Sequence, residues 1–154
     1  MIRQHIYIDT SVFGGYFDKE FEKDTKLFFN RILNKDFIVY ISEISNIELL
    51  PAPLHVKDLV SQVPVDCLVS LAFTEEAREL ADKYIVEKAL GKASFNDAYH
   101  IAIATINRID VLVSWNFRHI VNLDKIRLFN SINLKLGYPA IDIRTPKELI
   151  KYED

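Results

Sequence analysis

Short apolar runs rich in β-branched residues alternate along the chain with longer stretches of helical character, and this alternation constrains the fold most. The runs span residues 5–8, 37–41, 111–113 and 140–143, with a weaker candidate at 65–71. Strands that alternate with helices pair in parallel, because right-handed crossovers carry each helix over a face of the sheet. The sequence therefore predicts an α/β fold with a parallel sheet of four or five strands and helices on both faces.

Capping residues predict where several helices begin and end. Hydroxyl side chains favour three helix starts, at Ser42, Thr74 and Ser94. The third resembles a capping box in which Asp97 replaces the usual glutamate. Pro51 should end the helix that contains Glu48, and Gly137 should end a helix over residues 124–136.

The composition describes an ordinary globular protein. The chain has 154 residues, of which 49% are hydrophobic and 27% charged, enough to bury a full core. We therefore expect a single domain over residues 1–154. Cys67 is the only cysteine, which excludes an intrachain disulfide, and its apolar neighbours predict a buried thiol. With no signal-peptide pattern and no apolar stretch long enough to cross a bilayer, we expect a cytoplasmic protein without membrane contact.

The charge is unevenly distributed. A net charge of −3 argues against long-range attraction of the whole protein to nucleic acid. Residues 117–137, however, carry four basic side chains against one acidic, a local charge of +3, with His119 in addition. The basic residues are Arg118, Lys125, Arg127 and Lys135. Phosphate contact and an ordinary solvated helix face both explain this stretch.

Polar side chains follow three of the predicted strands. Asp9 follows the first strand, Glu48 lies in the helix after the second, and Asn116 follows residues 111–113. Ligands bind beyond the carboxyl ends of parallel strands, so these groups should meet at one rim. Asp97 joins them if its helix begins near that rim. Clustered carboxylates favour a hard divalent cation such as Mg²⁺ or Mn²⁺, which supports hydrolysis. No two histidines have zinc-ligand spacing, so zinc is not expected.

Each of these residues also has a purely structural interpretation. Asp9 and Asp97 are explained equally well by N-terminal helix capping. Glu48 could be a solvated residue of an amphipathic helix, and Asn116 could start a turn. We interpret His100 as a hydrogen-bonded, partly buried histidine rather than a catalytic group.

Four segments carry a resemblance to a known family. They are IYIDTSV at residues 6–12, ISEISNIEL at 41–49, FNDAYHIA at 95–102 and VLVSWNFRH at 111–119. Together they resemble the PIN-domain family, which includes the VapC-type toxins of bacterial and archaeal toxin–antitoxin pairs. The resemblance implies a three-layer sandwich around the sheet, Mg²⁺ or Mn²⁺ held by three or four acidic residues, and cleavage of RNA.

The resemblance also implies a role for particular residues. Matched by motif, the metal ligands are Asp9, Glu48 and Asp97, with Asn116 at a fourth catalytic position. The expected substrate-binding residues are Thr10, Ser11, Arg118 and His119. Many family members carry aspartate where this chain has Asn116, and an amide adds no negative charge. A second metal ion should therefore bind more weakly.

We thus expect a metal-dependent endoribonuclease that hydrolyses RNA phosphodiester bonds. If it is a toxin, an antitoxin protein would be its partner, and residues 14–17 and 21–29 are candidates for that contact or for a homodimer face. Ordinary helix packing is the better explanation of these segments. The alternative function is a catalytically weakened RNA- or protein-binding module. A phosphatase of the haloacid-dehalogenase type needs a second aspartate where the chain has Ser11.

Overall fold

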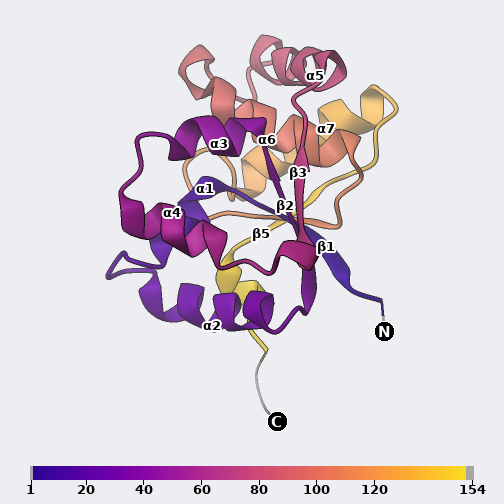
Figure 1. The fold of residues 1–154 in the computed structure, drawn as a ribbon. Helices are drawn as coiled ribbons and strands as arrows, with labels where there is room; N and C mark the ends of the chain where they lie inside the picture. Colours follow the sequence, from indigo (N-terminus) through magenta and orange to yellow (C-terminus); the bar gives the residue numbers. More distant parts are fainter. Residues whose placement is uncertain (1, 152–154) are drawn as a thin grey trace.

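A parallel five-stranded sheet lies at the centre of the computed structural model, which describes residues 2–151 (Figure 1). The strands are β1 (Gln4–Ile8), β2 (Phe37–Ser42), β3 (Leu68–Leu71), β4 (Val111–Val113) and β5 (Asp142–Arg144). Their order is β3-β2-β1-β4-β5, and every pairing is parallel. The chain thus winds outward from β1 in both directions, which places the end of β1 between the ends of β2 and β4.

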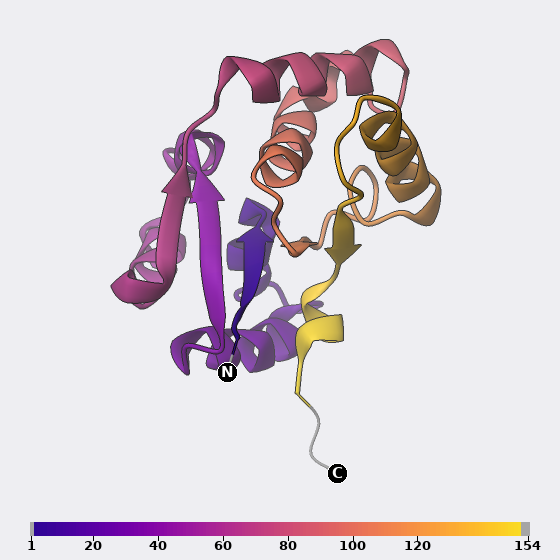
Figure 2. The same ribbon diagram turned by 90° about the vertical axis from the view of Figure 1, so that its right-hand side faces the viewer.

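Helices cover both faces of this sheet and make it the middle of three layers, as predicted. They are α1 (Thr10–Gly15), α2 (Glu22–Leu33), α3 (Glu43–Leu49), α4 (Leu54–Ser61), α5 (Glu75–Val86), α6 (Phe95–Ile106) and α7 (Leu123–Lys135). One face packs against α5, α6 and α7, and the other against α1, α2 and α4 (Figure 2). The α/β three-layer fold is confirmed.

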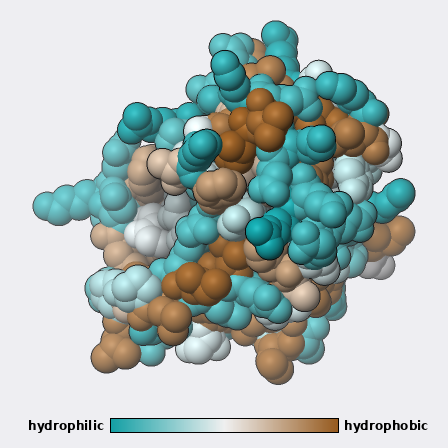
Figure 3. All heavy atoms as spheres, turned by 90° about the horizontal axis from the view of Figure 1, so that it is seen from above, coloured by the Kyte–Doolittle hydropathy of each residue, from teal (hydrophilic) through white to brown (hydrophobic). Residues whose placement is uncertain are grey.

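The strands supply both halves of the core by alternating their side chains. Tyr7 points into the half formed with α5, α6 and α7, whereas Ile6 and Ile8 point into the other half. Each such buried side chain contributes roughly 1.5–3 kcal/mol of transfer free energy. The face seen in Figure 3 is mostly hydrophilic with separate apolar patches. Within residues 2–151, no helix combines the length and apolar character that a membrane span requires.

Several predicted boundaries change in the structure. In the weak strand candidate at 65–71, residues Val65–Cys67 form a 3-10 turn, in which the Cys67 amide donates to the Pro64 carbonyl oxygen at 2.9 Å. Cys67 is buried, as predicted. The last strand begins two residues later than expected, at Asp142, and the predicted 124–136 helix is α7.

Two of the three predicted helix caps are confirmed. The Thr74 hydroxyl accepts from the Ala77 amide at 3.2 Å, and the Ser42 hydroxyl accepts from the Ile44 amide within a capping box at the start of α3. The capping box at Ser94 is wrong: this residue ends a 3-10 turn, and its side chain makes no capping hydrogen bond. The turn already bonds the Ser94 amide to the Gly91 carbonyl, so α6 follows from it directly.

Candidate metal centre

Asp9 lies where β1 ends and is anchored to the neighbouring strand. Its backbone is at the N-cap of α1, but its side chain makes no capping hydrogen bond. Instead, Oδ2 accepts from the hydroxyls of Ser11 and Ser114, each at 2.7 Å. Because Ser114 directly follows β4, these bonds hold the carboxylate between the two strand ends. Asp9 is only 4% exposed, so capping does not explain it.

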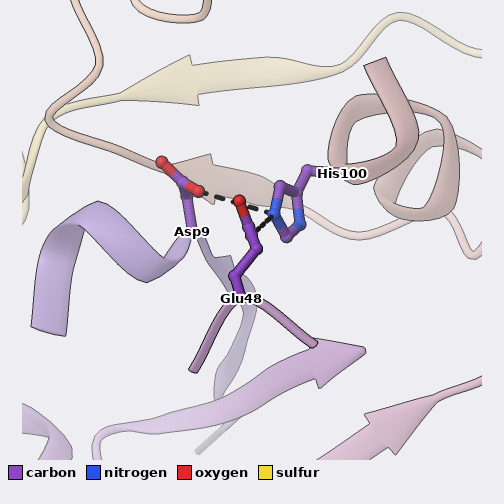
Figure 4. A group of neighbouring side chains, drawn as sticks. All are labelled: Asp9, Glu48 and His100. Carbon is purple, nitrogen blue, oxygen red and sulfur yellow. Dashed lines mark hydrogen bonds and ion pairs between the residues drawn. The ribbon is translucent and has the colours of Figure 1, made fainter. Parts of the chain in front are cut away.

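Glu48 and His100 point toward Asp9 from two helices (Figure 4). The Ser42 cap starts α3 directly at the end of β2, and this brings Glu48 over the rim of the sheet. Its Oε1 accepts from the Thr10 hydroxyl at 3.2 Å and forms a hydrogen bond with Nε2 of His100. The same Nε2 lies 3.6 Å from Oδ1 of Asp9. One potential ligand atom from each of Asp9, Glu48 and His100 lies within 4.8 Å of the other two.

Asp97 and Asn116 lie at the edge of the same site. Asp97 is in the first turn of α6, and its Oδ1 accepts from Nδ2 of Asn116 at 3.4 Å. Oδ1 of Asn116 accepts from the His119 amide at 3.0 Å, which fixes the side-chain amide in a turn. Both residues line a cleft of about 410 Å³ together with Asp9 and Glu48. All four predicted catalytic residues therefore share one cleft, although Asp97 is not in the tight group around His100.

The cleft concentrates negative charge in partly desolvated surroundings. Burial raises the pKa of Asp97 to about 6, and the charge of Asp9 adds to this rise. Burial alone would lower the pKa of His100, but its hydrogen bond to Glu48 and the nearby carboxylate charges outweigh burial and raise it. Such shifts mark a cluster that is short of positive charge, as metal-binding and catalytic sites often are.

The predicted substrate-binding residues divide into two pairs. Thr10 and Ser11 line the cleft, and their hydroxyls donate to Glu48 and Asp9. Arg118 and His119 follow Asn116 but, among the residues described, are not part of the cleft lining. Arg118 is exposed. The pKa of His119 is lowered by burial and by the charges of Arg118 and Lys125.

Two residues of the site were not predicted. His100 was expected to be hydrogen-bonded and only partly buried; the hydrogen bonding is confirmed, but the residue is fully buried. Its position three residues after Asp97, on the same side of one helix, was the available signal. Ser114 also escaped prediction, although its place at the end of β4 put it on the same rim as Asp9.

Comparison with known proteins finds solved structures that have the same fold. FitAcB from Neisseria gonorrhoeae has the same fold at 17% identity and a TM-score of 0.57, over 92% of this chain and 97% of that one. VapC20 from Mycobacterium tuberculosis, described as a sarcin-ricin loop cleaving toxin, is 18% identical with a TM-score of 0.55, over 74% and 92%. DNA-bound VapBC from Salmonella typhimurium is 16% identical with a TM-score of 0.54, over 94% and 99%.

The sequence itself matches a family model. Among curated proteins, no sequence is a significant match. The PIN-domain model, however, matches residues 6–121, which is more than half of the chain and includes all the acidic residues of the cleft. The chain belongs to the PIN-domain family.

Proposed function

We propose that the chain is a metal-dependent endoribonuclease that hydrolyses RNA phosphodiester bonds. The observation that carries the proposal is the meeting of Asp9, Glu48 and Asp97 in one cleft from three separate parts of the fold. PIN domains are generally nucleases. Burial and, after it, the charge of Asp9 raise the pKa of Asp97, and a bound cation would favour its ionised form. We further propose that the protein works as a single domain in the cytoplasm.

The donor set fits a divalent ion. Oδ2 of Asp9 is occupied by two serine hydroxyls, which leaves Oδ1 facing Glu48 and His100. Asp9, Glu48 and Asp97 would hold Mg²⁺ or Mn²⁺, since both ions bind carboxylate oxygens. When bound, such an ion would offset the carboxylate charges, polarise the scissile phosphate and make a water molecule more acidic.

The residues around the acids keep them in place for this chemistry. Ser11 and Ser114 orient Asp9, Thr10 orients Glu48, and Asn116 orients Asp97. Preorganised groups of this kind lower a barrier because they need not rearrange during reaction. The cleft is also lined by four apolar residues, Leu49, Ala52, Pro53 and Val56.

RNA contact would come from the segment after Asn116. Arg118 is exposed and His119 partly exposed, so both are available to a phosphate group. Two lysines of the basic stretch contact other groups of the protein, whereas Arg127 is exposed on α7. Lys135 pairs with Glu87 at 2.9 Å, and Lys125 donates to the carbonyl oxygen of Ala89 at 2.6 Å. We therefore assign phosphate binding to Arg118 and His119, beside the cleft.

An antitoxin partner is part of the proposal. The similar structures include a VapBC complex bound to DNA, which supports a protein partner of this kind. Part of the two segments considered for such a contact is internal, since Phe28 and Phe29 belong to the core. Phe17 and Leu27 keep 43% and 42% exposure and remain the candidates within these segments for antitoxin contact or a homodimer face.

The test compares Asp9→Asn with a surface control, Asp58→Asn, whose side chain is exposed on α4. Cleavage of a fluorescent single-stranded RNA in Mn²⁺ or Mg²⁺ should fall by two orders of magnitude or more in Asp9→Asn, on the order of what a lost catalytic group costs. Asp58→Asn should cleave as the wild type does, and circular dichroism should show both variants folded. RNA cleavage by Asp9→Asn at the wild-type rate would refute the proposed metal-dependent nuclease site.

Asn116 favours one alternative. Its amide adds no charge to the cleft and is bonded on both sides, to Asp97 and to the His119 amide. A PIN-like module that binds RNA or protein without cutting would fit a site weakened in this way. If the wild-type protein neither cleaves RNA nor binds Mn²⁺ in titration calorimetry, the module is the better description.

A further inference from the structure

A buried chain of hydrogen bonds runs from the cleft to the start of α3. Nδ1 of His100 lies 2.6 Å from the Tyr7 hydroxyl, which lies 2.7 Å from the Ser42 hydroxyl. Ser42 in turn accepts from the Ile44 amide and caps α3, the helix that carries Glu48. Ser42, Tyr7 and His100 are each 0% exposed. These hydrogen bonds thus connect His100 with the start of the helix that carries Glu48.

This arrangement resembles the way proteins hold a metal-binding histidine. In such sites the ring nitrogen that does not bind the ion is hydrogen-bonded to a neighbour, which sets the tautomer and the direction of the ring. If the Tyr7 hydroxyl donates to Ser42, its oxygen accepts from Nδ1–H of His100. Nε2 then carries the proton that is shared with Glu48, and loss of this proton would leave its lone pair directed at Asp9 and Glu48.

The distances allow one ion to contact all three residues. Nε2 of His100 lies 3.6 Å from Oδ1 of Asp9, which is less than twice a metal–ligand distance of about 2.1 Å. One ligand atom from each of Asp9, Glu48 and His100 lies within 4.8 Å of the others, and an ion bound among them would replace the proton shared by Nε2 and Oε1 of Glu48. Asp97 lies outside this group, and its Oδ1 accepts from Nδ2 of Asn116.

We propose that Nε2 of His100 binds the ion together with Asp9 and Glu48, and that this nitrogen makes the site select Mn²⁺ over Mg²⁺. Mg²⁺ is bound mainly through oxygen, whereas imidazole is a better ligand for first-row transition metals. The inference rests on the proposed function, because it specifies the ion and one ligand of the same centre. Tyr7 is a positioning residue that holds the ring of His100.

The experiment uses Mn²⁺ itself as the probe. Pulsed electron paramagnetic resonance of the Mn²⁺-loaded protein should show the ¹⁴N coupling of a bound imidazole. The coupling should be absent in His100→Gln and unchanged in His55→Gln, a control at an exposed histidine of α4. In titration calorimetry, His100→Gln should weaken Mn²⁺ binding by at least tenfold, on the order of the loss for disturbed metal sites, and Mg²⁺ binding much less.

Tyr7→Phe keeps His100 as the proposed metal ligand but removes the hydroxyl that is hydrogen-bonded to its Nδ1. It should weaken Mn²⁺ binding by roughly tenfold while the ¹⁴N coupling persists, so it tests the hydrogen-bond chain separately and does not require His100→Gln to fold. Mn²⁺ binding without ¹⁴N coupling in the wild type would overturn the inference and leave the nuclease proposal standing. Binding of neither Mn²⁺ nor Mg²⁺ would overturn both.

Discussion

Replacing Gly15 with alanine should destabilise the fold and loosen the metal centre, although it adds only a methyl group. Gly15 is the last residue of α1, and a Cβ there would lie 2.6 Å from Cδ1 and 2.8 Å from Nε1 of Trp115. The indole would have to shift. Nε1 of the Trp115 indole donates to the Thr25 hydroxyl at 2.9 Å, and the backbone amide of Trp115 donates to the Ser11 hydroxyl at 3.0 Å. Ser11 also binds Asp9, so the shift reaches the cleft.

The expected decrease in the free energy of unfolding of Gly15→Ala has three contributions. Forcing a methyl group into a packed site costs ~1–3 kcal/mol, and losing the hydrogen bond between Trp115 and Thr25 costs ~1 kcal/mol more. The better helix propensity of alanine returns up to ~1 kcal/mol, so Gly15→Ala should lose a net ~1–3 kcal/mol. A Cβ at Gly14 would meet nothing within 4 Å. Gly14→Ala should therefore gain up to ~1 kcal/mol, and the two variants should differ by about 1–4 kcal/mol.

Urea unfolding followed by tryptophan fluorescence measures this difference. Trp115 is the only tryptophan, so the signal comes from the residue that the substitution displaces. The two free energies of unfolding are obtained by linear extrapolation, and calorimetric titration should show weaker Mn²⁺ binding in Gly15→Ala than in Gly14→Ala. Equal stability of the two variants would refute the close packing of Trp115 against α1.

Two substitutions at the edge of the cleft should act in opposite directions. Asp97→Asn should raise the melting temperature near neutral pH and weaken Mn²⁺ binding, because the pKa of Asp97 is raised from 3.8 to about 6 and folding therefore disfavours its ionised form. This penalty is absent below the unfolded pKa, grows as the pH rises towards the folded pKa and is constant above it, so an equal stability gain at acid and neutral pH would contradict it. Asn116→Asp should tighten Mn²⁺ binding and lower the stability of the metal-free protein, because it places a carboxylate beside Asp97. Unchanged Mn²⁺ affinity in titration calorimetry would place residue 116 outside the metal site.

The α/β fold was predictable because its strongest signals are local. Strands buried on both faces need continuous apolar runs, and residues 5–8, 37–41 and 111–113 have that character. Prediction was weaker where a turn competes with a strand, as at Val65–Cys67, which forms a 3-10 turn after Pro64. It failed at Ser94 for a related reason, because this residue ends a 3-10 turn with φ −105° and ψ 31° and so lacks the extended backbone of a capping serine.

The sequence by itself determined that several acids would stand near one rim, because Asp9 directly follows a strand and the ends of parallel strands share an edge. Only the tertiary structure decided which groups face one another. The rotation of α6 on the sheet turns His100 toward Asp9 and Glu48 and leaves Asp97 at the side. Helical spacing relates residues within one helix, but the direction in which that helix faces depends on packing against residues far away in the chain. The approach of Trp115 to Gly15 is decided by the same long-range packing.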